Sequence, residues 1–136
     1  MLFNPAESID LNGNTGPFIQ YTYARIKSVL RKGGELINLS KDFSNYKLSE
    51  EEKKLIKTLY QYPHIVREAG QNYSPALIAN YGYEVAKAFN HFYHDHVIVD
   101  ENDSITSSFR LAISKLTSVV ILESMKLLGI RVPERM

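Results

Sequence analysis

The sequence predicts an all-α fold, a bundle of four or five helices, and three observations support this. Apolar residues recur at spacings of three and four along several stretches, as they do on one face of an amphipathic helix. Residues that typically start and end helices bound these stretches. The connections are short, and no two stretches alternate apolar and polar residues as paired strands would, which favours a helical bundle.

Composition limits the class of protein. The chain has 136 residues, of which 44% are hydrophobic and 23% charged, as expected for one globular domain. Sixteen basic and fifteen acidic residues give a net charge of +1, which argues against a strongly basic nucleic-acid binder. With no cysteine, disulfides and thiolate metal sites are excluded. We find no signal peptide and no uninterrupted apolar run of about 18 residues, so we expect a cytoplasmic protein.

The first long helix is expected over 18–32, after a lead-in loop over 1–16. Thr15 is the predicted N-cap, and Pro17 falls in the first turn, where a proline is tolerated. The glycines at 33–34 end the helix after a basic last turn. Its core face is predicted to carry Ile19, Tyr23, Ile26 and Leu30.

A capping box formed by Ser49 and Glu52 predicts the start of the next helix, after a connector without strong periodicity. Pro63 interrupts this helix, because proline lacks the backbone N–H that a helix interior needs. We therefore expect a second, angled segment over 64–72.

Ser74 and Pro75 start the next helix as N-cap and first-turn proline, and it runs to about His94. Apolar positions at helical spacing predict its core face, which carries Leu77, Tyr81, Val85, Ala88 and Phe92.

The final helix is expected to begin at a cap formed by Asp103 or Ser104 and to run to Leu128, with Gly129 closing it. Its core face is predicted to carry Ile105, Phe109, Ala112, Leu116 and Val119.

Two helix faces away from these core stripes are candidate binding surfaces. On the first helix the face begins aromatic and ends basic, which suits a splayed base stacked on a ring beside a phosphate; it carries Phe18, Tyr21, Arg25, Ser28 and Lys32. On the helix from Ser74 the corresponding stripe carries Tyr83, Lys87, Asn90 and His94, with Tyr93 on its flank. Nearby small residues would let another helix or a ligand approach: Ala79, Gly82 and Ala86. The ordinary alternative for both faces is a solvated surface with partly buried aromatics.

Charge is distributed unevenly. The segment 20–34 carries four basic residues and no acid, and the segment 110–136 carries five basic and two acidic residues. A modest basic surface built from the two ends of the chain is therefore expected.

Catalytic signals are weak. The chain has no phosphate-binding glycine loop of the GxxxxGK type and no nucleophile elbow. One metal-like cluster is present, formed by His91, His94, Asp95 and His96. No third and fourth ligand is evident, so we interpret these as capping or surface histidines and predict neither a metal site nor a catalytic residue.

Three strings, in order, resemble the C-terminal anticodon-binding domain of arginyl-tRNA synthetases, also called the DALR domain. They are GNTGPFIQYTYARIKSVLRK, LIANYGYEVAKAFNHFYHDHVIV and RLAISKLTSVVILESMKLLGIRVPERM. The positions that match the family's first motif are Gly13, Asn14, Thr15, Gly16, Pro17, Phe18, Ile19, Gln20, Tyr21 and Arg25. One departure is visible: Asp103, Ser104, Ile105 and Thr106 stand where the family has D-A-L-R.

The resemblance implies the helical anticodon-binding bundle of class Ia aminoacyl-tRNA synthetases, over 1–136, which holds the anticodon stem-loop of tRNA-Arg. It implies contacts from Tyr21, Arg25, Tyr93 and Met136. Met136 would be an apolar shelf under a base, or would act through its carboxylate and backbone; the ordinary alternative is a frayed terminus. Together with the two stripes, this predicts the RNA-binding set Phe18, Tyr21, Arg25, Tyr83, Lys87, Asn90, Tyr93 and Met136.

The class I catalytic signatures, H-I-G-H and a K-M-S-K-S-like string, do not occur in the chain. The resemblance therefore implies a non-catalytic domain of a longer enzyme that ligates arginine to tRNA-Arg with ATP and Mg²⁺. No site for arginine, ATP or Mg²⁺ is expected in this chain. The expected partners are tRNA-Arg and the catalytic domain of the parent chain; we expect no membrane, no DNA and a monomer. Two rivals remain open: a protein-interaction module with an aromatic groove, and a small enzyme built on His91, His94 and His96.

Overall fold

A computed structural model describes residues 5, 10, 11 and 13–136, so the loop predicted over 1–16 lies partly outside the described residues. The described part of the chain is helical and contains no strand, which confirms the all-α prediction. Its elements are α2 (Gly16–Gly33), the 3₁₀ turn η1 (Gly34–Leu36), α3 (Glu50–Tyr60), α4 (Tyr62–Gln71), α5 (Pro75–Asp95) and α6 (Ser104–Leu127).

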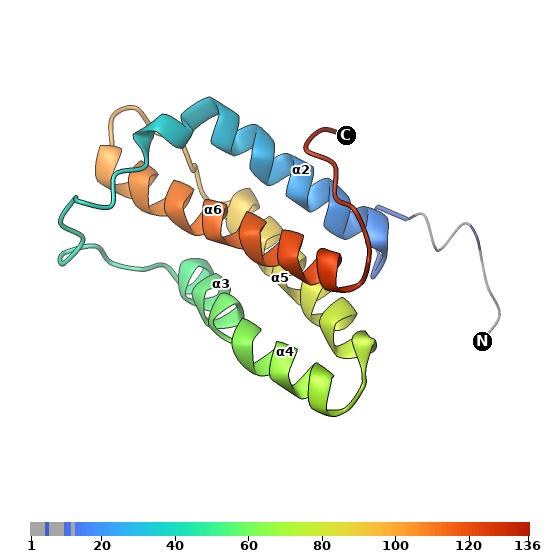
Figure 1. The fold of residues 1–136 in the computed structure, drawn as a ribbon. Helices are drawn as coiled ribbons and strands as arrows, with labels where there is room; N and C mark the ends of the chain where they lie inside the picture. The colour runs from blue at the N-terminus through green and yellow to red at the C-terminus, as the bar shows by residue number, and fades with distance from the viewer. Residues whose placement is uncertain (1–4, 6–9, 12) are drawn as a thin grey trace.

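The bundle is arranged around α6 (Figure 1). In this view α6 lies between α2 on one side and α3 and α4 on the other, and α5 passes behind it. The core forms where α2, α5 and α6 pack together, and α3 closes the remaining side against α5. The chain after α6 turns back and runs along α2.

Most of the predicted helix starts are confirmed. The hydroxyl of Thr15 accepts a hydrogen bond from the Phe18 backbone N–H at 3.3 Å. The capping box of Ser49 and Glu52 is complete, with both reciprocal bonds present. Asp103 caps α6 by accepting from the Thr106 backbone N–H at 3.0 Å. Ser74 is the exception: it occupies the N-cap position of α5, but its side chain makes no capping bond.

The glycines that were predicted to end helices act in two different ways. Gly129 has a φ of +72°, the left-handed conformation that favours glycine, and it turns the tail away from α6. Gly33 ends α2 for a packing reason instead. A Cβ at Gly33 would lie 2.7 Å from Cγ2 of Val99, so only glycine lets the loop before α6 pass this closely.

The predicted core faces of α2 and α5 are confirmed. Seven of the nine predicted core side chains on these helices are buried, namely Ile19, Tyr23, Ile26, Tyr81, Val85, Ala88 and Phe92. Leu30 and Leu77 are half-buried. The small residues of α5 also have the predicted effect, since Ile19 of α2 packs directly over the backbone of Gly82.

The predicted core face of α6 is wrong. Ile105, Leu116 and Val119 are 45, 51 and 48% exposed, and the other two predicted core residues, Phe109 and Ala112, are only half-buried. The side of α6 that is buried instead carries Leu111, Ile113, Val120, Ile121 and Met125, together with the hydroxyl residues Ser107, Ser108, Ser114, Thr117, Ser118 and Ser124.

Small hydroxyl residues suit the buried side of a central helix because they let neighbouring helices approach closely. Five of the six donate to backbone carbonyls, which removes the cost of burying a polar group, whereas the buried hydroxyl of Ser124 has no partner among the described residues. Thr117 donates to the Ile113 carbonyl at 2.7 Å, and Ser114 donates to the Arg110 carbonyl at 2.7 Å. By length and composition α6 could cross a membrane, but half of its most apolar window is buried within the bundle.

Candidate nucleic-acid interface

Arg25 lies between two tyrosine rings that come from different helices. Tyr21 stands one turn before Arg25 on α2, so the two side chains share a face. The guanidinium carbon lies 4.8 Å from the centre of the Tyr21 ring and 5.2 Å from that of Tyr93, near the end of α5. Both rings remain open to solvent, with 38 and 39% of the residue exposed. The arrangement is a cation–π stack with exposed aromatic surface on both sides.

An amide clamp fixes this arginine. Asn90 accepts a hydrogen bond from Nη1 of Arg25 and donates through Nδ2 to the hydroxyl of Thr22 at 2.8 Å. Thr22 is fully buried, and its hydroxyl donates to the Phe18 carbonyl at 2.9 Å. Asn90 therefore couples the partly buried cation to the interior of the bundle and holds it in place.

Two hollows adjoin at this stack. The first has a volume of about 440 Å³ and the second about 680 Å³, and both are lined by Arg25 and Tyr93. The structure brings all eight predicted site residues to their walls. The first is lined by Tyr21, Arg25, Tyr93 and Met136, and the second by Phe18, Arg25, Tyr83, Lys87, Asn90 and Tyr93.

The first hollow is strongly basic. Beside Arg25 it is lined by Arg31, Lys32 and Arg135, and none of the described residues that line it is acidic. These cations come from the last turns of α2 and from the end of the chain, as the charge distribution predicted. Arg135 was not among the predicted site residues, although it directly precedes Met136.

The C-terminal tail is attached to α2 at three points. Gln20 donates to the Arg131 carbonyl at 2.7 Å, and Arg31 donates to the Glu134 carbonyl at 3.2 Å. The Glu134 carboxylate forms an ion pair with Lys27 at 2.9 Å, and this pairing lowers the pKa of Glu134. These contacts bring Met136 to the first hollow, although its side chain is 63% exposed.

The second hollow is more aromatic. The rings of Phe18 on α2 and Tyr83 on α5 pack with their centres 5.3 Å apart, and the ammonium of Lys87 lies 6.0 Å from the centre of the Tyr83 ring. His91 and His94 complete the rim. This region combines stacking surface with cations, as the two stripes predicted.

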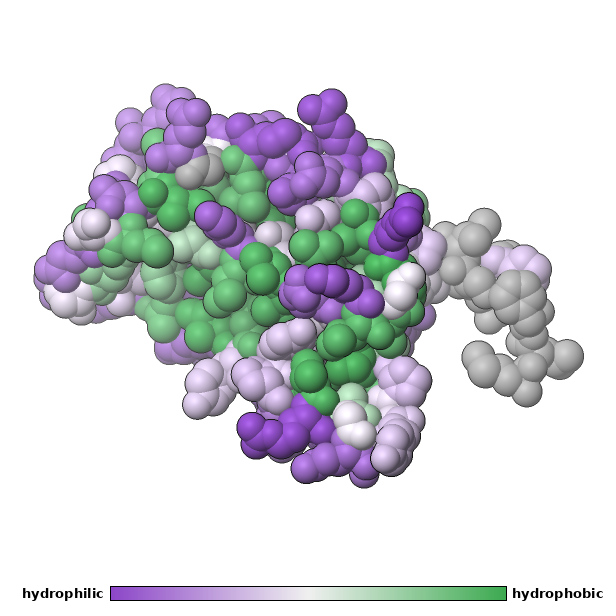
Figure 2. All heavy atoms as spheres, viewed as in Figure 1, coloured by the Kyte–Doolittle hydropathy of each residue, from purple (hydrophilic) through white to green (hydrophobic). Residues whose placement is uncertain are grey.

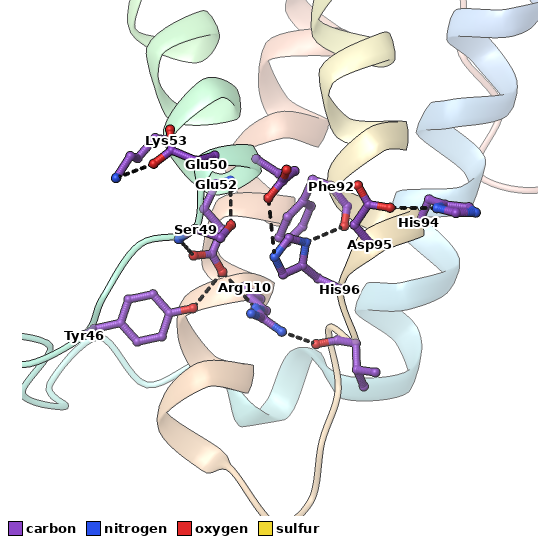
Figure 3. A network of polar contacts seen from close by, with 12 residues as sticks. Tyr46, Ser49, Glu50, Glu52, Lys53, Phe92, His94, Asp95, His96 and Arg110 are labelled. Atoms are coloured by element: carbon purple, nitrogen blue, oxygen red, sulfur yellow. Dashed lines mark hydrogen bonds and ion pairs between the residues drawn. The ribbon is translucent and has the colours of Figure 1, made fainter.

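The histidines near the end of α5 have different partners. His94 pairs with Asp95 at 2.7 Å, while Nδ1 of His96 lies 3.1 Å from the Phe92 carbonyl. Figure 3 shows the two rings directed to different partners. No group of three or more metal-ligating side chains occurs among the residues that the structure describes.

A second polar cluster lies where the start of α3 meets α6, close to the C-terminal end of α5 (Figure 3), and only its capping box was predicted from the sequence. The carboxylate of Glu52 accepts from Tyr46 at 2.6 Å, from Nε of Arg110 at 2.8 Å and from the Ser49 backbone N–H at 2.8 Å. Arg110 also donates to the Val97 carbonyl at 2.8 Å. We call these five residues the Glu52 network.

Glu52 is the buried centre of the Glu52 network, and Tyr46, Ser49 and Arg110 around it are partly buried. Glu52 is fully buried, and burial by itself raises its pKa. The hydrogen bonds from Tyr46, Ser49 and Arg110 outweigh burial, so that the pKa of Glu52 lies below its ordinary value. Burial and the bond to Glu52 raise the pKa of Tyr46 to about 12. The capping box was the only part of this network that sequence could show.

Comparisons with known proteins identify relatives of this chain. The DALR anticodon binding domain family matches residues 19–136. Arginine–tRNA ligases of Parabacteroides distasonis and Bacteroides fragilis are 52% and 51% identical over 138 aligned residues, which cover all of this chain and 23% of each ligase. The chain therefore spans less than a quarter of the length of these relatives.

Solved structures give the same result. The arginyl-tRNA synthetase of Thermus thermophilus matches 98% of this chain at 26% identity with a TM-score of 0.83, over 23% of its own length. The enzyme of Plasmodium falciparum matches 98% of the chain at 26% identity with a TM-score of 0.76. The motif resemblance and the fold are confirmed, and the chain belongs to the DALR anticodon-binding domain family.

Proposed function

We propose that this chain reads the anticodon loop of tRNA-Arg as part of an arginine–tRNA ligase, with the loop seated across the two hollows. The observation that carries the proposal is the stack of Arg25 between Tyr21 and Tyr93, because Arg25 and Tyr93 line both hollows and Tyr21 lines the first.

The exposed aromatic rings beside Arg25 suit the binding of unstacked RNA bases. Sequence-specific RNA recognition uses loop bases that have left the helical stack, which stack on aromatic or guanidinium planes and present their edges to polar groups. Tyr21 and Tyr93 each expose ring surface beside such a plane. Met136 adds an apolar surface at the first hollow, and the Phe18–Tyr83 pair adds another at the second.

The cations supply the electrostatic part of binding. Arg31, Lys32 and Arg135 line the first hollow, and Lys87 lines the second. Each cation that contacts a phosphate releases counterions, so binding weakens as salt rises. Asn90 acts as a positioning residue, because its amide holds Arg25 in the stack.

The longer protein that this assignment implies is a ligase that joins arginine to tRNA-Arg with ATP and Mg²⁺ in the cytoplasm. In this proposal the catalytic chemistry belongs to the part of the polypeptide outside this chain. The chain itself binds RNA, acts as a monomer and has no site for ATP, Mg²⁺, DNA or a membrane.

A titration of fluorescent tRNA-Arg and of a non-cognate tRNA at several salt concentrations tests the proposal. We expect tighter binding to tRNA-Arg and an affinity that falls steeply with salt. Equal affinity for the two tRNAs would contradict anticodon reading. Absence of RNA binding would instead favour a protein-interaction module that uses the aromatic hollow.

A further inference from the structure

The outward side of α6 is apolar. Besides Ile105, Leu116 and Val119, the side chains of Leu122 and Leu127 are 37 and 57% exposed. We call these five residues the α6 stripe. Figure 2 shows a broad apolar area over α6 and its border with α3 and α4, broken by a few hydrophilic side chains. Contiguous apolar surface of this kind marks an interaction site.

A hollow continues the α6 stripe toward the junction of α3 and α4. Its volume is about 510 Å³, and it is lined largely by apolar and aromatic side chains, including Leu59, Tyr60, Tyr62, Pro63, Leu116 and Val120. Tyr60 is 87% exposed at its edge. A stripe of aliphatic side chains with an adjoining hollow suits a partner that presents a protruding apolar side chain.

The composition of α6 shows that the stripe is not simply a surplus of apolar residues. The side that packs into the bundle includes six serine and threonine residues besides five large apolar ones, whereas five further large aliphatic side chains face outward. A helix that had only the bundle as its neighbour would bury those large side chains, because the free energy gained scales with the apolar area removed from water. This distribution fits a helix with protein on both sides.

We infer that the α6 stripe is the surface on which the remaining part of the arginine–tRNA ligase polypeptide packs. The inference rests on the proposed function. About three quarters of each matched relative lies outside the region that corresponds to this chain, which provides a covalently linked partner. None of the stripe residues lines either RNA hollow, so docking of this partner leaves Arg25 and both tyrosines open.

Cross-linking in a full-length protein tests the inference. In the Parabacteroides distasonis ligase, this chain would replace the corresponding segment, and photoreactive benzoylphenylalanine would replace Val119. The matched control places it at Leu39, which is 74% exposed in the connector before α3. We expect Val119 to cross-link to the ligase body within one polypeptide and Leu39 not to. Cross-links between two copies, or equal yields at both positions, would overturn the inference.

A double variant separates docking from folding. Leu116→Ser with Val119→Ser should make the domain separable from the ligase body by limited proteolysis, whereas Leu39→Ser should not. Unfolding of the 136-residue chain alone should be almost unchanged, because both side chains are already exposed. Unchanged proteolysis, or equal destabilisation of the chain alone, would overturn docking.

Binding of tRNA-Arg to the ligase that carries benzoylphenylalanine at position 119 keeps this inference distinct from the proposed function. If tRNA-Arg binds but no cross-link forms within the polypeptide, the docking inference is wrong and the proposed function stands. If the cross-link forms but tRNA-Arg does not bind, the proposed function is wrong and the docking inference stands.

Discussion

Arg110 and Arg25 are both partly buried arginines, yet their partners differ. Arg110 pairs with the fully buried carboxylate of Glu52, so its charge is neutralised inside the bundle. Arg25 has a neutral amide and two tyrosine rings as partners, and it takes part in no ion pair found among the described residues. An arginine whose charge is satisfied holds the fold together, whereas one held by neutral groups keeps its charge for an anion from outside.

Removing Arg110 should have the largest effect on stability. Arg110→Ala leaves the Glu52 carboxylate buried without its charged partner, and such losses destabilise by about 3–5 kcal/mol. Urea unfolding measures the change. Arg67→Ala, at an exposed arginine on α4, is the control and should change stability by less than about 0.5 kcal/mol. Equal effects would mean that the Glu52 network is not the structural cluster described above.

Truncating Tyr21 should have a smaller effect than removing Arg110. It should weaken the binding of tRNA-Arg and leave the stability of the fold unchanged. Tyr21→Ala removes one ring of the stack, and loss of base stacking costs about 1–3 kcal/mol per base. A tRNA-Arg titration measures this loss, and circular dichroism should show the helix content unchanged. Tyr60→Ala removes an 87% exposed ring that lines neither RNA hollow and should leave affinity unchanged. Melting of Tyr21→Ala would instead identify this ring as a structural residue.

Low pH should destabilise the fold by protonating Glu52 at the centre of the Glu52 network. The pKa of Glu52 in the folded chain lies below its ordinary value of 4.5, so the ionised carboxylate stabilises the fold above about pH 4.5. That contribution is lost as pH falls through the folded pKa. Glu52→Gln should therefore be less stable at pH 7 and should lose less stability between pH 5 and 3. Parallel stability curves for the two proteins, measured by urea unfolding, would contradict this.

Arg25 should show the smallest but most diagnostic effect, on the salt dependence. Arg25→Ala should lower the slope of log affinity against log salt by about one, as expected when one phosphate contact is lost. Arg25→Lys keeps the charge but loses the planar stack. It should retain the slope and still bind tRNA-Arg more weakly. A slope that is the same in the parent and in Arg25→Ala would place Arg25 away from the RNA backbone.

Local signals in the sequence were reliable because they depend on neighbours along the chain. The capping box of Ser49 and Glu52 and the Asp103 cap follow from bonds within one helical turn. Tyr21 and Arg25 share a face because they are four residues apart. The pairing of Glu52 with Arg110 could not be predicted in the same way, since 58 residues separate them.

The wrong prediction of the core face of α6 has a different cause. Leu116 and Val119 show the spacing of a core stripe, yet periodicity reports only that a face is apolar and not what covers it. The buried face of α6 contains serines and threonines, which are polar and therefore do not indicate a core position in the sequence. Their burial costs little free energy when the hydroxyl donates to a nearby backbone carbonyl. Motif resemblance identified the family where periodicity alone would have stopped at a helical bundle.

The most direct test of the account compares the two arginine clusters in one experiment. NMR spectra of the isotope-labelled chain would be recorded during titration with the anticodon stem-loop of tRNA-Arg. We predict that signals of Tyr21, Arg25, Tyr93 and Met136 shift on binding, while those of the Glu52 network stay in place. Shifts concentrated in the Glu52 network, with Tyr21 and Arg25 unaffected, would contradict the placement of the RNA site.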